Sequence, residues 1–331
     1  MEGGGSAMDI EMLQKRAAII RQVRSFFDEK QYLELDTPLL SPDLIPESCL
    51  EVFETQRLFP PGSRKEKQPL WLIPSPEIWM KKIIAQRRVN VYQICKCFRN
   101  GESSGHLHSP EFTMLEYYTM DADYTDSLAL TEELFARLAK EAQIPSLCPP
   151  FERITVAQAF ERRAGFDLFA AAEKEGAMEE EARRLGLDPP PGMTTGEIYD
   201  LIFIHAVEPF LKSEKPIALI DYPAFVPCLA KKSKGGGTTE RWELYYSGIE
   251  LANCFSEETD PEKVKEFFIS EEAAKENSAI VKHKVDRDYW KIFRQGQGFP
   301  RCSGVALGLD RLIMALSGRS TIDGVLPFAH E

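Results

Sequence analysis

Two segments that alternate between apolar and polar residues constrain the fold more than any other feature of the sequence. They are VNVYQICKCFR at 89–99 and EFTMLEYYTM at 111–120, and a polar loop with glycines joins them. This pattern predicts a long-looped antiparallel hairpin. Since successive side chains on a strand point to opposite faces, one face of the second strand should carry a row of aromatic, methionine and glutamate side chains, which is typical of the wall of a pocket. That row consists of Phe112, Met114, Glu116, Tyr118 and Met120.

The other patterned segments predict an antiparallel sheet with helices packed around it, an α+β architecture. Apolar residues recur at intervals of three and four from Leu13 to Phe27, which predicts a helix. Strand patterns lie at 70–73, 217–223 and 241–255. The chain closes with a strand-to-helix unit, CSGVALGLDRLIMAL. Neither GxxxxGK(S/T) nor GxGxxG occurs, so an ATP site would have to be built differently.

The acidic balance of the chain limits its partners. Its 40 Lys and Arg residues and 52 Asp and Glu residues give a net charge of −12. A field of this sign repels phosphate backbones, so we expect no non-specific binding to nucleic acid and no adhesion to anionic membranes. No apolar run approaches the roughly 18 to 20 residues that cross a bilayer, and the start lacks an export signal, which predicts a cytoplasmic protein.

The length of 331 residues, 43% of them hydrophobic, allows one large domain or two small ones. We expect residues 1–9 to be a disordered leader or an expression remnant, with Met8 as a candidate native start. Residues 10–331 then form a single domain with a helical and loop insertion at about 151–215, where DPPPGM breaks the pattern. The basic run at 230–240, AKKSKGGGTTE, favours a mobile loop over a phosphate cradle, because no helix start follows it.

Several glutamates occupy positions from which they could line a cleft. Glu77 follows Ser75, which can cap a helix with Pro76 in its first position. Glu116 lies in the strand row, and Glu250 and Glu257 flank Asn253. Carboxylates in a cleft recognise ammonium groups or hold Mg²⁺, and the alternative interpretation is a set of solvated surface acids.

Two arginines balance these acids. Arg99 ends the first strand of the hairpin, and Arg311 opens the last helix after GVALG. A guanidinium group forms a fork that matches two phosphate oxygens at once. Each arginine taken alone is typical of a surface ion pair. Together with the glutamates, they indicate a cleft with cations at one end and acids at the other.

Four separated blocks of the sequence follow one another in a defined order. They are Pro38 after an extended segment, CFRNGESSGHLHSPEFTMLEYY, GIELANCFSEETD and GVALGLDRL. In this order they resemble the signature motifs of the class II aminoacyl-tRNA synthetase catalytic domain, and specifically its lysyl branch, from about residue 13 to 317. The resemblance implies the class II catalytic fold, with an antiparallel sheet flanked by helices, and the use of ATP and Mg²⁺ to form an aminoacyl-adenylate.

Lysyl-tRNA synthetases carry an N-terminal barrel that reads the anticodon, and the first motif starts here too early to leave room for such a domain. The chain therefore resembles the stand-alone paralogues that modify a protein, the elongation factor P (R)-β-lysine ligases, as does YPA at 222–224. This resemblance implies an ATP-dependent, AMP-forming ligase that transfers lysine or (R)-β-lysine to elongation factor P. It also implies a homodimer that pairs near Phe27 to Pro38. The alternatives are a truncated synthetase-like enzyme that acts on tRNA or a small acceptor, and a non-catalytic amino-acid-binding paralogue.

The resemblance assigns roles by matching positions. Arg99 and Arg311 would be catalytic and contact the α- and γ-phosphates. The residues implied for ATP are Arg99, Asn100, Glu102, His108, Phe112, Glu250, Glu257, Gly308 and Arg311, with Mg²⁺ on Glu250 and Glu257. The residues implied for the amino acid are Ser75, Glu77, Glu116, Tyr118, Asn253, Gly304 and Ala306. Glu116 and Tyr118 would receive the side-chain ammonium, and Glu77 the other amino group.

Three positions depart from the synthetase pattern. Gly101 makes the loop before the expected adenine contact one residue longer. Leu107 stands where the synthetases often carry an arginine for the γ-phosphate, which leaves that role to His106, to His108 or to no residue. Ala306 replaces a second glycine, and its methyl group narrows the floor of the amino-acid site. We expect this methyl to disfavour an α-amino group and to tolerate one on the β-carbon.

Overall fold

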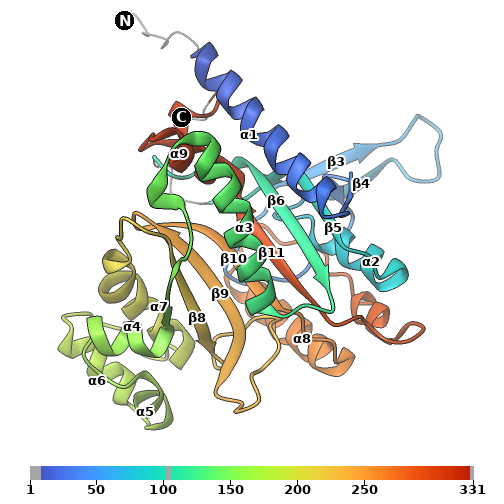
Figure 1. The fold of residues 1–331 in the computed structure, drawn as a ribbon. Coiled ribbons are helices and arrows are strands. Elements are labelled where there is room, and N and C mark those ends of the chain that lie inside the picture. The colour runs from blue at the N-terminus through green and yellow to red at the C-terminus, as the bar shows by residue number, and fades with distance from the viewer. Residues whose placement is uncertain (1–8, 102–105, 329–331) are drawn as a thin grey trace, which may run out of the picture.

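An eight-stranded sheet crosses the molecule and carries helices on both faces (Figure 1). The structure is a computed structural model that describes residues 9–101 and 106–328. Its strands are β1 (Leu33–Glu34), β2 (Leu40–Ser41), β3 (Glu54–Leu58), β4 (Lys67–Leu72), β5 (Val91–Phe98), β6 (Glu111–Met120), β7 (Glu152–Thr155), β8 (Ile217–Pro223), β9 (Thr238–Tyr246), β10 (Ile249–Ser256) and β11 (Cys302–Gly308). Its α-helices are α1 (Ile10–Glu29), α2 (Glu77–Arg87), α3 (Tyr124–Ala142), α4 (Val156–Arg163), α5 (Leu168–Glu173), α6 (Ala177–Arg184), α7 (Thr195–Ile202), α8 (Pro261–Ser278) and α9 (Leu309–Ser317).

The strand order confirms the predicted α+β class. The large sheet runs β1-β5-β6-β11-β10-β9-β8-β7 and is antiparallel except for the two edge pairs, β1 with β5 and β7 with β8. The strands β2, β4 and β3 form a second, smaller sheet. The predicted hairpin is β5 and β6, in which Gln93 lies opposite Glu116. The segment predicted as one strand at 241–255 is instead a tight hairpin, because Ser247 and Gly248 adopt positive φ between β9 and β10.

The helices α1, α3 and α9 cover one face of the sheet and enclose the main core (Figure 1). Leu115 and Tyr117 of β6 point into this core. The predicted apolar stripe on α1 is correct at Val23 and Phe27 but wrong at Ala17, which is exposed. Arg16, the residue before Ala17, points inward instead, and its guanidinium lies 2.6 Å from the carboxylate of Asp310 at the start of α9.

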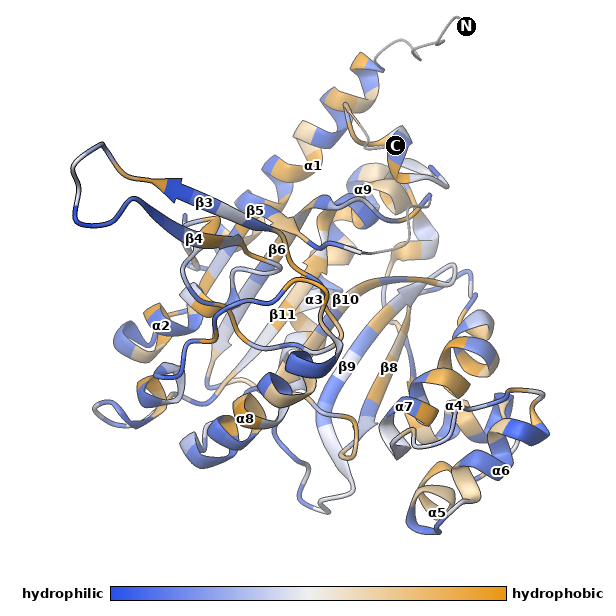
Figure 2. Ribbon diagram, turned by 180° about the vertical axis from the view of Figure 1, so that it is seen from behind, coloured by the Kyte–Doolittle hydropathy of each residue, from blue (hydrophilic) through white to orange (hydrophobic). Residues whose placement is uncertain are grey.

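The other face of the sheet carries α2, α8 and the loops that surround the functional residues. Figure 2 shows α8 lying across this face, with the hairpin of β3 and β4 projecting from the body of the molecule. The residues at 47–51 connect this side to α8, because Ser48 and Glu271 are hydrogen-bonded although 223 positions separate them. The loop at 47–51 is therefore held over this face by residues that are distant in the sequence.

The segment at 151–215 contains the helices α4 to α7 and packs around a core cluster of its own beside β8 (Figure 1). It also contains β7, an edge strand that pairs with β8, whereas the sequence predicted only helices and loops in this segment. The division of the chain into a main domain with an insertion remains a prediction. Asp9 caps α1 and so belongs to the fold, whereas residues 1–8 of the expected leader lie outside the described residues. Among the described helices, none is long and apolar enough to cross a membrane.

Candidate active site

The predicted functional residues meet in a cleft on the second face of the sheet. The cleft consists of two adjoining cavities of about 380 and 200 Å³. We call them the arginine cavity, which contains Arg311, and the glutamate cavity, which contains Glu116. The predicted row on β6 lines the cleft except for Met120, which packs in a neighbouring apolar cluster. Seven residues border both cavities and form their shared wall: Glu47, Cys49, Arg99, Met114, Arg241, Asn253 and Ala306.

The arginine cavity holds Arg311 in a fixed position at the start of α9. Its guanidinium donates to the backbone carbonyl oxygens of Glu250 at 2.9 Å and Leu107 at 3.3 Å, and it lies 3.4 Å from Nδ1 of His108. Phe112 and Gly308 line the same cavity. The guanidinium of Arg99 lies 5.3 Å from the centre of the Phe112 ring. Two guanidinium groups beside an aromatic ring suit the phosphates and the base of a nucleotide.

The expected metal pair of Glu250 and Glu257 does not share one cavity, because Glu250 lies near the start of β10 and Glu257 directly follows its end. Seven steps along the chain at about 3.3 Å each separate the two residues by roughly 20 Å. Glu250 lines the arginine cavity and Glu257 the glutamate cavity. Glu243 on the neighbouring strand β9 shares the arginine cavity with Glu250 instead. Burial and the Glu243 carboxylate raise the pKa of Glu250.

Glu243 and Glu250 fit the requirements of Mg²⁺. This ion prefers oxygen ligands and is commonly bound by one or two carboxylates together with substrate phosphates. The carboxylate of Glu243 is oriented by Arg241 at 2.5 Å and by the hydroxyl of Tyr245 at 2.8 Å. Within residues 9–101 and 106–328, no group of three or more His, Cys, Asp or Glu could hold a metal ion. Phosphate oxygens would therefore have to complete the coordination.

Five carboxylates line the glutamate cavity, and one buried ammonium group lies behind two of them. Lys81 of α2 is fully buried, and its Nζ lies 2.6 Å from the carboxylates of both Glu77 and Glu257. Tyr118 donates a hydrogen bond of 2.7 Å to one oxygen of Glu116. The other oxygen of Glu116 and Oε1 of Glu257 are buried without a hydrogen-bond partner among the described residues. Such orphaned carboxylate oxygens suit the donors of a bound ammonium group.

Burial controls the charge state of this cavity. It raises the pKa of Glu116 well above its usual range, with a further contribution from Glu77. It also raises the pKa of Glu257 to about 8, although the Lys81 ammonium opposes this shift. Burial alone would lower the pKa of Lys81, but Glu257 and Glu77 overcome that effect and raise it. Lys81 therefore stays charged, whereas part of the acid set is protonated near neutral pH.

The floor of the cleft is the strand β11. A Cβ atom added to Gly304 would lie 2.5 Å from Cε1 of Tyr118 and 2.9 Å from Oε1 of Glu257, so only glycine fits there. Two residues on, Ala306 lies opposite Asn253 on one side and Glu116 on the other. Its methyl group consequently projects at the shared wall, where the two cavities meet.

Some predicted site residues lie elsewhere or differ from expectation. Asn100 lines neither cavity, and its side chain instead contacts the carbonyl of Val52 at 3.4 Å. Ser75 lines the glutamate cavity but does not cap α2, because the helix begins at Glu77 and Pro76 occupies the cap position. Glu102, expected at the adenine, lies outside the described residues.

The charged residues that were not identified from the sequence include Glu47, Arg241 and Glu243 of the cleft and Lys81, which is buried behind Glu77 and Glu257. Two of them carry a signal that could have found them. Lys81 follows Glu77 by four positions on a helix, which places both on one face. Glu243 precedes Glu250 by seven positions, and recognition of the turn at Ser247 would have brought the two strands together. Glu47 has no comparable local signal.

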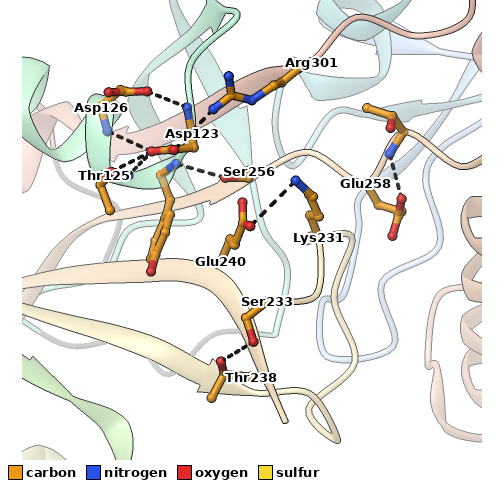
Figure 3. A network of polar contacts seen from close by, with 12 residues as sticks. Asp123, Thr125, Asp126, Lys231, Ser233, Thr238, Glu240, Ser256, Glu258 and Arg301 are labelled. Carbon is orange, nitrogen blue, oxygen red and sulfur yellow. Dashed lines mark hydrogen bonds and ion pairs between the residues drawn. The ribbon is translucent and has the colours of Figure 1, made fainter. Parts of the chain in front are cut away.

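In the basic run at 230–240, residues 231–233 turn back and form hydrogen bonds with residues 238–240 at the start of β9. The run does not form a phosphate cradle. Glu240 N donates to Lys231 O at 2.8 Å, and Ser233 N donates to Thr238 O at 2.9 Å. Figure 3 shows Lys231 directed at the carboxylate of Glu240, 3.7 Å away, with Ser233 and Thr238 joined near the tip. None of the lysines in this run lines either cavity. Its mobility remains a prediction.

Comparison with known proteins gives a consistent result. The family described as tRNA synthetases class II (D, K and N) matches residues 7–331. The elongation factor P (R)-beta-lysine ligase of Avibacterium paragallinarum is 36% identical over 323 residues, which cover 97% of this chain and 96% of the relative. The protein of the same name from Histophilus somni (strain 2336) is 34% identical over 320 residues, covering 96% and 95%. That of Haemophilus influenzae (strain PittGG) is 33% identical over 324 residues, covering 98% and 96%.

Proposed function

Because this chain belongs to the class II tRNA synthetase family, we propose that it is a ligase that activates (R)-β-lysine with ATP and transfers it to a lysine side chain of elongation factor P. The observation that carries the proposal is the shared wall between a cavity lined by three guanidinium groups and a cavity lined by five carboxylates. A doubly aminated acid and a nucleotide can meet across this wall. The names of relatives that cover nearly the whole chain support the same substrate and acceptor.

ATP fits the arginine cavity with its phosphates between the two arginines. Arg99 on the shared wall would face the α-phosphate, and Arg311 the γ-phosphate, with Phe112 against the base. Glu243 and Glu250 would hold Mg²⁺, which when bound neutralises part of the phosphate charge. His108 stands beside Arg311, where a further contact to the terminal phosphate is available.

The charge of the glutamate cavity matches the substrate. At the end of the cavity next to Lys81, Glu77, Glu116 and Glu257 contribute three negative charges when ionised and Lys81 one positive charge, which leaves two. The other charged residues that line the cavity are the two glutamates Glu47 and Glu271 and the two arginines of the shared wall, Arg99 and Arg241. (R)-β-Lysine carries two ammonium groups and would neutralise them. Leaving a buried carboxylate unpaired is costly, so the cavity selects for both ammonium groups. The Ala306 methyl, at the shared wall, favours an amino group on the β-carbon over one on the α-carbon.

Activation needs alignment more than proton transfer. The carboxylate of the amino acid is already ionised at neutral pH, and its oxygen attacks the α-phosphorus of ATP. The bond to the bridging oxygen of the β-phosphate breaks, and pyrophosphate leaves. Arg99 would stabilise the charge that develops on the α-phosphate, and Asn253 would orient the attacking carboxylate from the shared wall.

The acceptor and the assembly complete the proposal. Elongation factor P supplies the lysine that attacks the acyl-adenylate, and we place this reaction in the cytoplasm. The chain would act as a homodimer that pairs near Phe27 to Pro38, where the short edge strand β1 and the end of α1 lie. Analytical sedimentation at micromolar concentration should show the dimer, and a stable 37.5 kDa species would contradict it.

The proposal is tested by separating activation from transfer. Pyrophosphate exchange is measured with (R)-β-lysine, with α-lysine and without amino acid, and we expect exchange to be fastest with (R)-β-lysine. Transfer is then followed by mass spectrometry of elongation factor P, which should gain one β-lysyl group. Charging of total tRNA without modification of elongation factor P would favour a synthetase-like enzyme. Absence of exchange with every lysine isomer would favour a non-catalytic paralogue.

A further inference from the structure

The transfer step requires a proton acceptor that the activation step does not. A lysine side chain has an ordinary pKa of about 10.4 and reaches the enzyme as an ammonium group, which is not a nucleophile. Its nitrogen must attack the acyl carbon of the adenylate. That carbon lies where the two cavities meet, because the phosphate of the adenylate needs the arginines and its amino groups need the glutamates. A base for this step must therefore border both cavities.

Of the seven residues on the shared wall, Glu47 and Cys49 can accept a proton at neutral pH. Arg99 and Arg241 keep their charge, and the remaining wall residues carry no basic group. Cys49 is an exposed residue, and an ordinary thiol pKa of about 8.5 already leaves little thiolate at pH 7. Partial loss of hydration and the nearby carboxylates of Glu47 and Glu271 raise the pKa of Cys49 further. Glu47 is the base that remains on this wall.

The backbone of Glu47 is held in place, whereas its carboxylate is available. Lys275 of α8 donates to the carbonyl oxygen of Glu47 at 2.9 Å, and Leu50 N donates to the same oxygen at 3.2 Å. Glu271 of α8 accepts a hydrogen bond from Ser48 N at 2.8 Å. Within the described part of the chain, no hydrogen bond or ion pair engages the carboxylate of Glu47. The turn thus presents this carboxylate to the cleft from a fixed position.

The surroundings of Glu47 suit a base that works near neutral pH. Burial and the carboxylate of Glu77 on α2 raise its pKa, and Glu271 on α8 adds to this effect. Arg99 at the end of β5 and Lys275 on α8 oppose it, and the resulting pKa is about 7. General bases are most effective when their pKa lies close to the operating pH.

We infer that Glu47 is the catalytic base of the transfer step, an inference that rests on the proposed function. Its carboxylate takes one proton from the acceptor ammonium, and the electron pair left on nitrogen forms the bond to the acyl carbon. The bond between that carbon and the phosphate oxygen breaks, and AMP leaves with the electron pair. The second proton of the amine departs on the AMP phosphate, and Glu47 returns its own proton to solvent.

The variant Glu47→Gln tests this inference because it keeps the shape of the side chain and removes the base. Single-turnover transfer from the preformed (R)-β-lysyl-adenylate to elongation factor P at pH 7 should fall by about 10²- to 10⁴-fold, with pyrophosphate exchange almost unchanged. In the unmodified enzyme, the transfer rate should rise with pH and level off above about 7, and the variant should lose this dependence. Glu47→Asp should keep part of the rate.

Two controls separate proton removal from other effects. Hydroxylamine is neutral at pH 7, so its attack on the bound adenylate should be equally fast in Glu47→Gln and in the unmodified enzyme. Glu54→Gln makes the same chemical change on the exposed strand β3, at a residue that lines neither cavity, and should transfer normally. Normal transfer by Glu47→Gln, or an equal loss toward elongation factor P and hydroxylamine, would overturn the inference. Failure of the unmodified enzyme to catalyse pyrophosphate exchange would instead overturn the proposed function.

Discussion

The arginine cavity and the glutamate cavity share a wall, but they handle their charges in different ways. In the arginine cavity, backbone carbonyls orient Arg311, and its nearest ion-pair contact is with the Glu250 carboxylate at 3.8 Å. Behind the glutamate cavity, Lys81 lies 2.6 Å from two carboxylates at once and is fully buried. Neutral backbone groups thus hold Arg311 in the first cavity, whereas a buried ammonium group balances part of the acidic charge of the second.

This difference has consequences for ligand binding. Guanidinium groups remain protonated at every pH that a protein tolerates, so the arginine cavity should bind phosphates over a broad range. Burial raises the pKa of Glu257 to about 8, so this carboxylate changes its charge within the working range. We therefore expect that single substitutions or a change of pH can alter the binding of the amino acid without altering the binding of ATP, and the reverse.

Glu250→Gln and Glu257→Gln should show the largest contrast, because Glu250 lines the arginine cavity and Glu257 lines the glutamate cavity. We expect Glu250→Gln to slow pyrophosphate exchange by about 10²- to 10³-fold and to raise the Mg²⁺ concentration required, since it weakens charge stabilisation at the phosphates. Glu257→Gln should instead raise the KM for (R)-β-lysine and leave the Mg²⁺ requirement as it was. The measurement is exchange rate against Mg²⁺ and amino acid in turn. A shifted Mg²⁺ requirement in Glu257→Gln would contradict the separation of the two sites.

Gly304→Ala should close the glutamate cavity and spare the arginine cavity. The new Cβ would lie 2.5 Å from the Tyr118 ring, so the ring or the strand must shift. An overpacked site typically costs about 1 to 3 kcal/mol, which corresponds to a rise of roughly 5- to 150-fold in the KM for the amino acid. The KM for ATP should stay the same. Gly235→Ala, whose Cβ would meet no atom within 4 Å, is the matched control, and similar kinetics for both variants would refute this account.

The parts of the cleft that the sequence predicts are those set by local periodicity. Alternation along β6 places Glu116 and Tyr118 on one face, and the register with β11 brings Ala306 opposite Glu116. The same rule applied along β10 could not find the second carboxylate that lines the arginine cavity with Glu250. That carboxylate belongs to Glu243 on β9, and a two-residue turn that does not interrupt the apolar pattern separates β9 from β10.

The parts that the sequence does not predict depend on contacts between distant segments. Glu47 reaches the cleft because α8 holds its turn through Lys275, 228 positions away. Composition and periodicity do not predict a contact between two segments so far apart in the sequence. The burial that shifts its pKa appears only once β5, α2 and α8 surround it. Catalytic residues on loops of this kind require the assembled structure.

Affinity for (R)-β-lysine should strengthen as pH rises from 6 to 8. Glu257 keeps its proton up to about pH 8 in the folded state but only to about 4.5 when unfolded, so its contribution to the free energy of unfolding decreases over that interval. Bound ammonium groups favour the ionised carboxylate, so the Kd should fall by up to about 10-fold per pH unit below 8. Titration calorimetry at pH 6, 7 and 8 measures this, with ATP as the control ligand. An equal Kd at all three values would show that Glu257 is already ionised without ligand.

Ala306→Gly should produce the smallest effect and test the shared wall itself. Removing the methyl opens space where Asn253 and Glu116 approach β11 from either side, which should admit an α-amino group. Since one methyl group is worth about 1 kcal/mol, we expect kcat/KM for α-lysine to improve by about 5- to 10-fold relative to (R)-β-lysine. Pyrophosphate exchange with both isomers gives the ratio. An unchanged ratio would mean that the preference is set by the carboxylates of the glutamate cavity, and that the wall only joins the two sites.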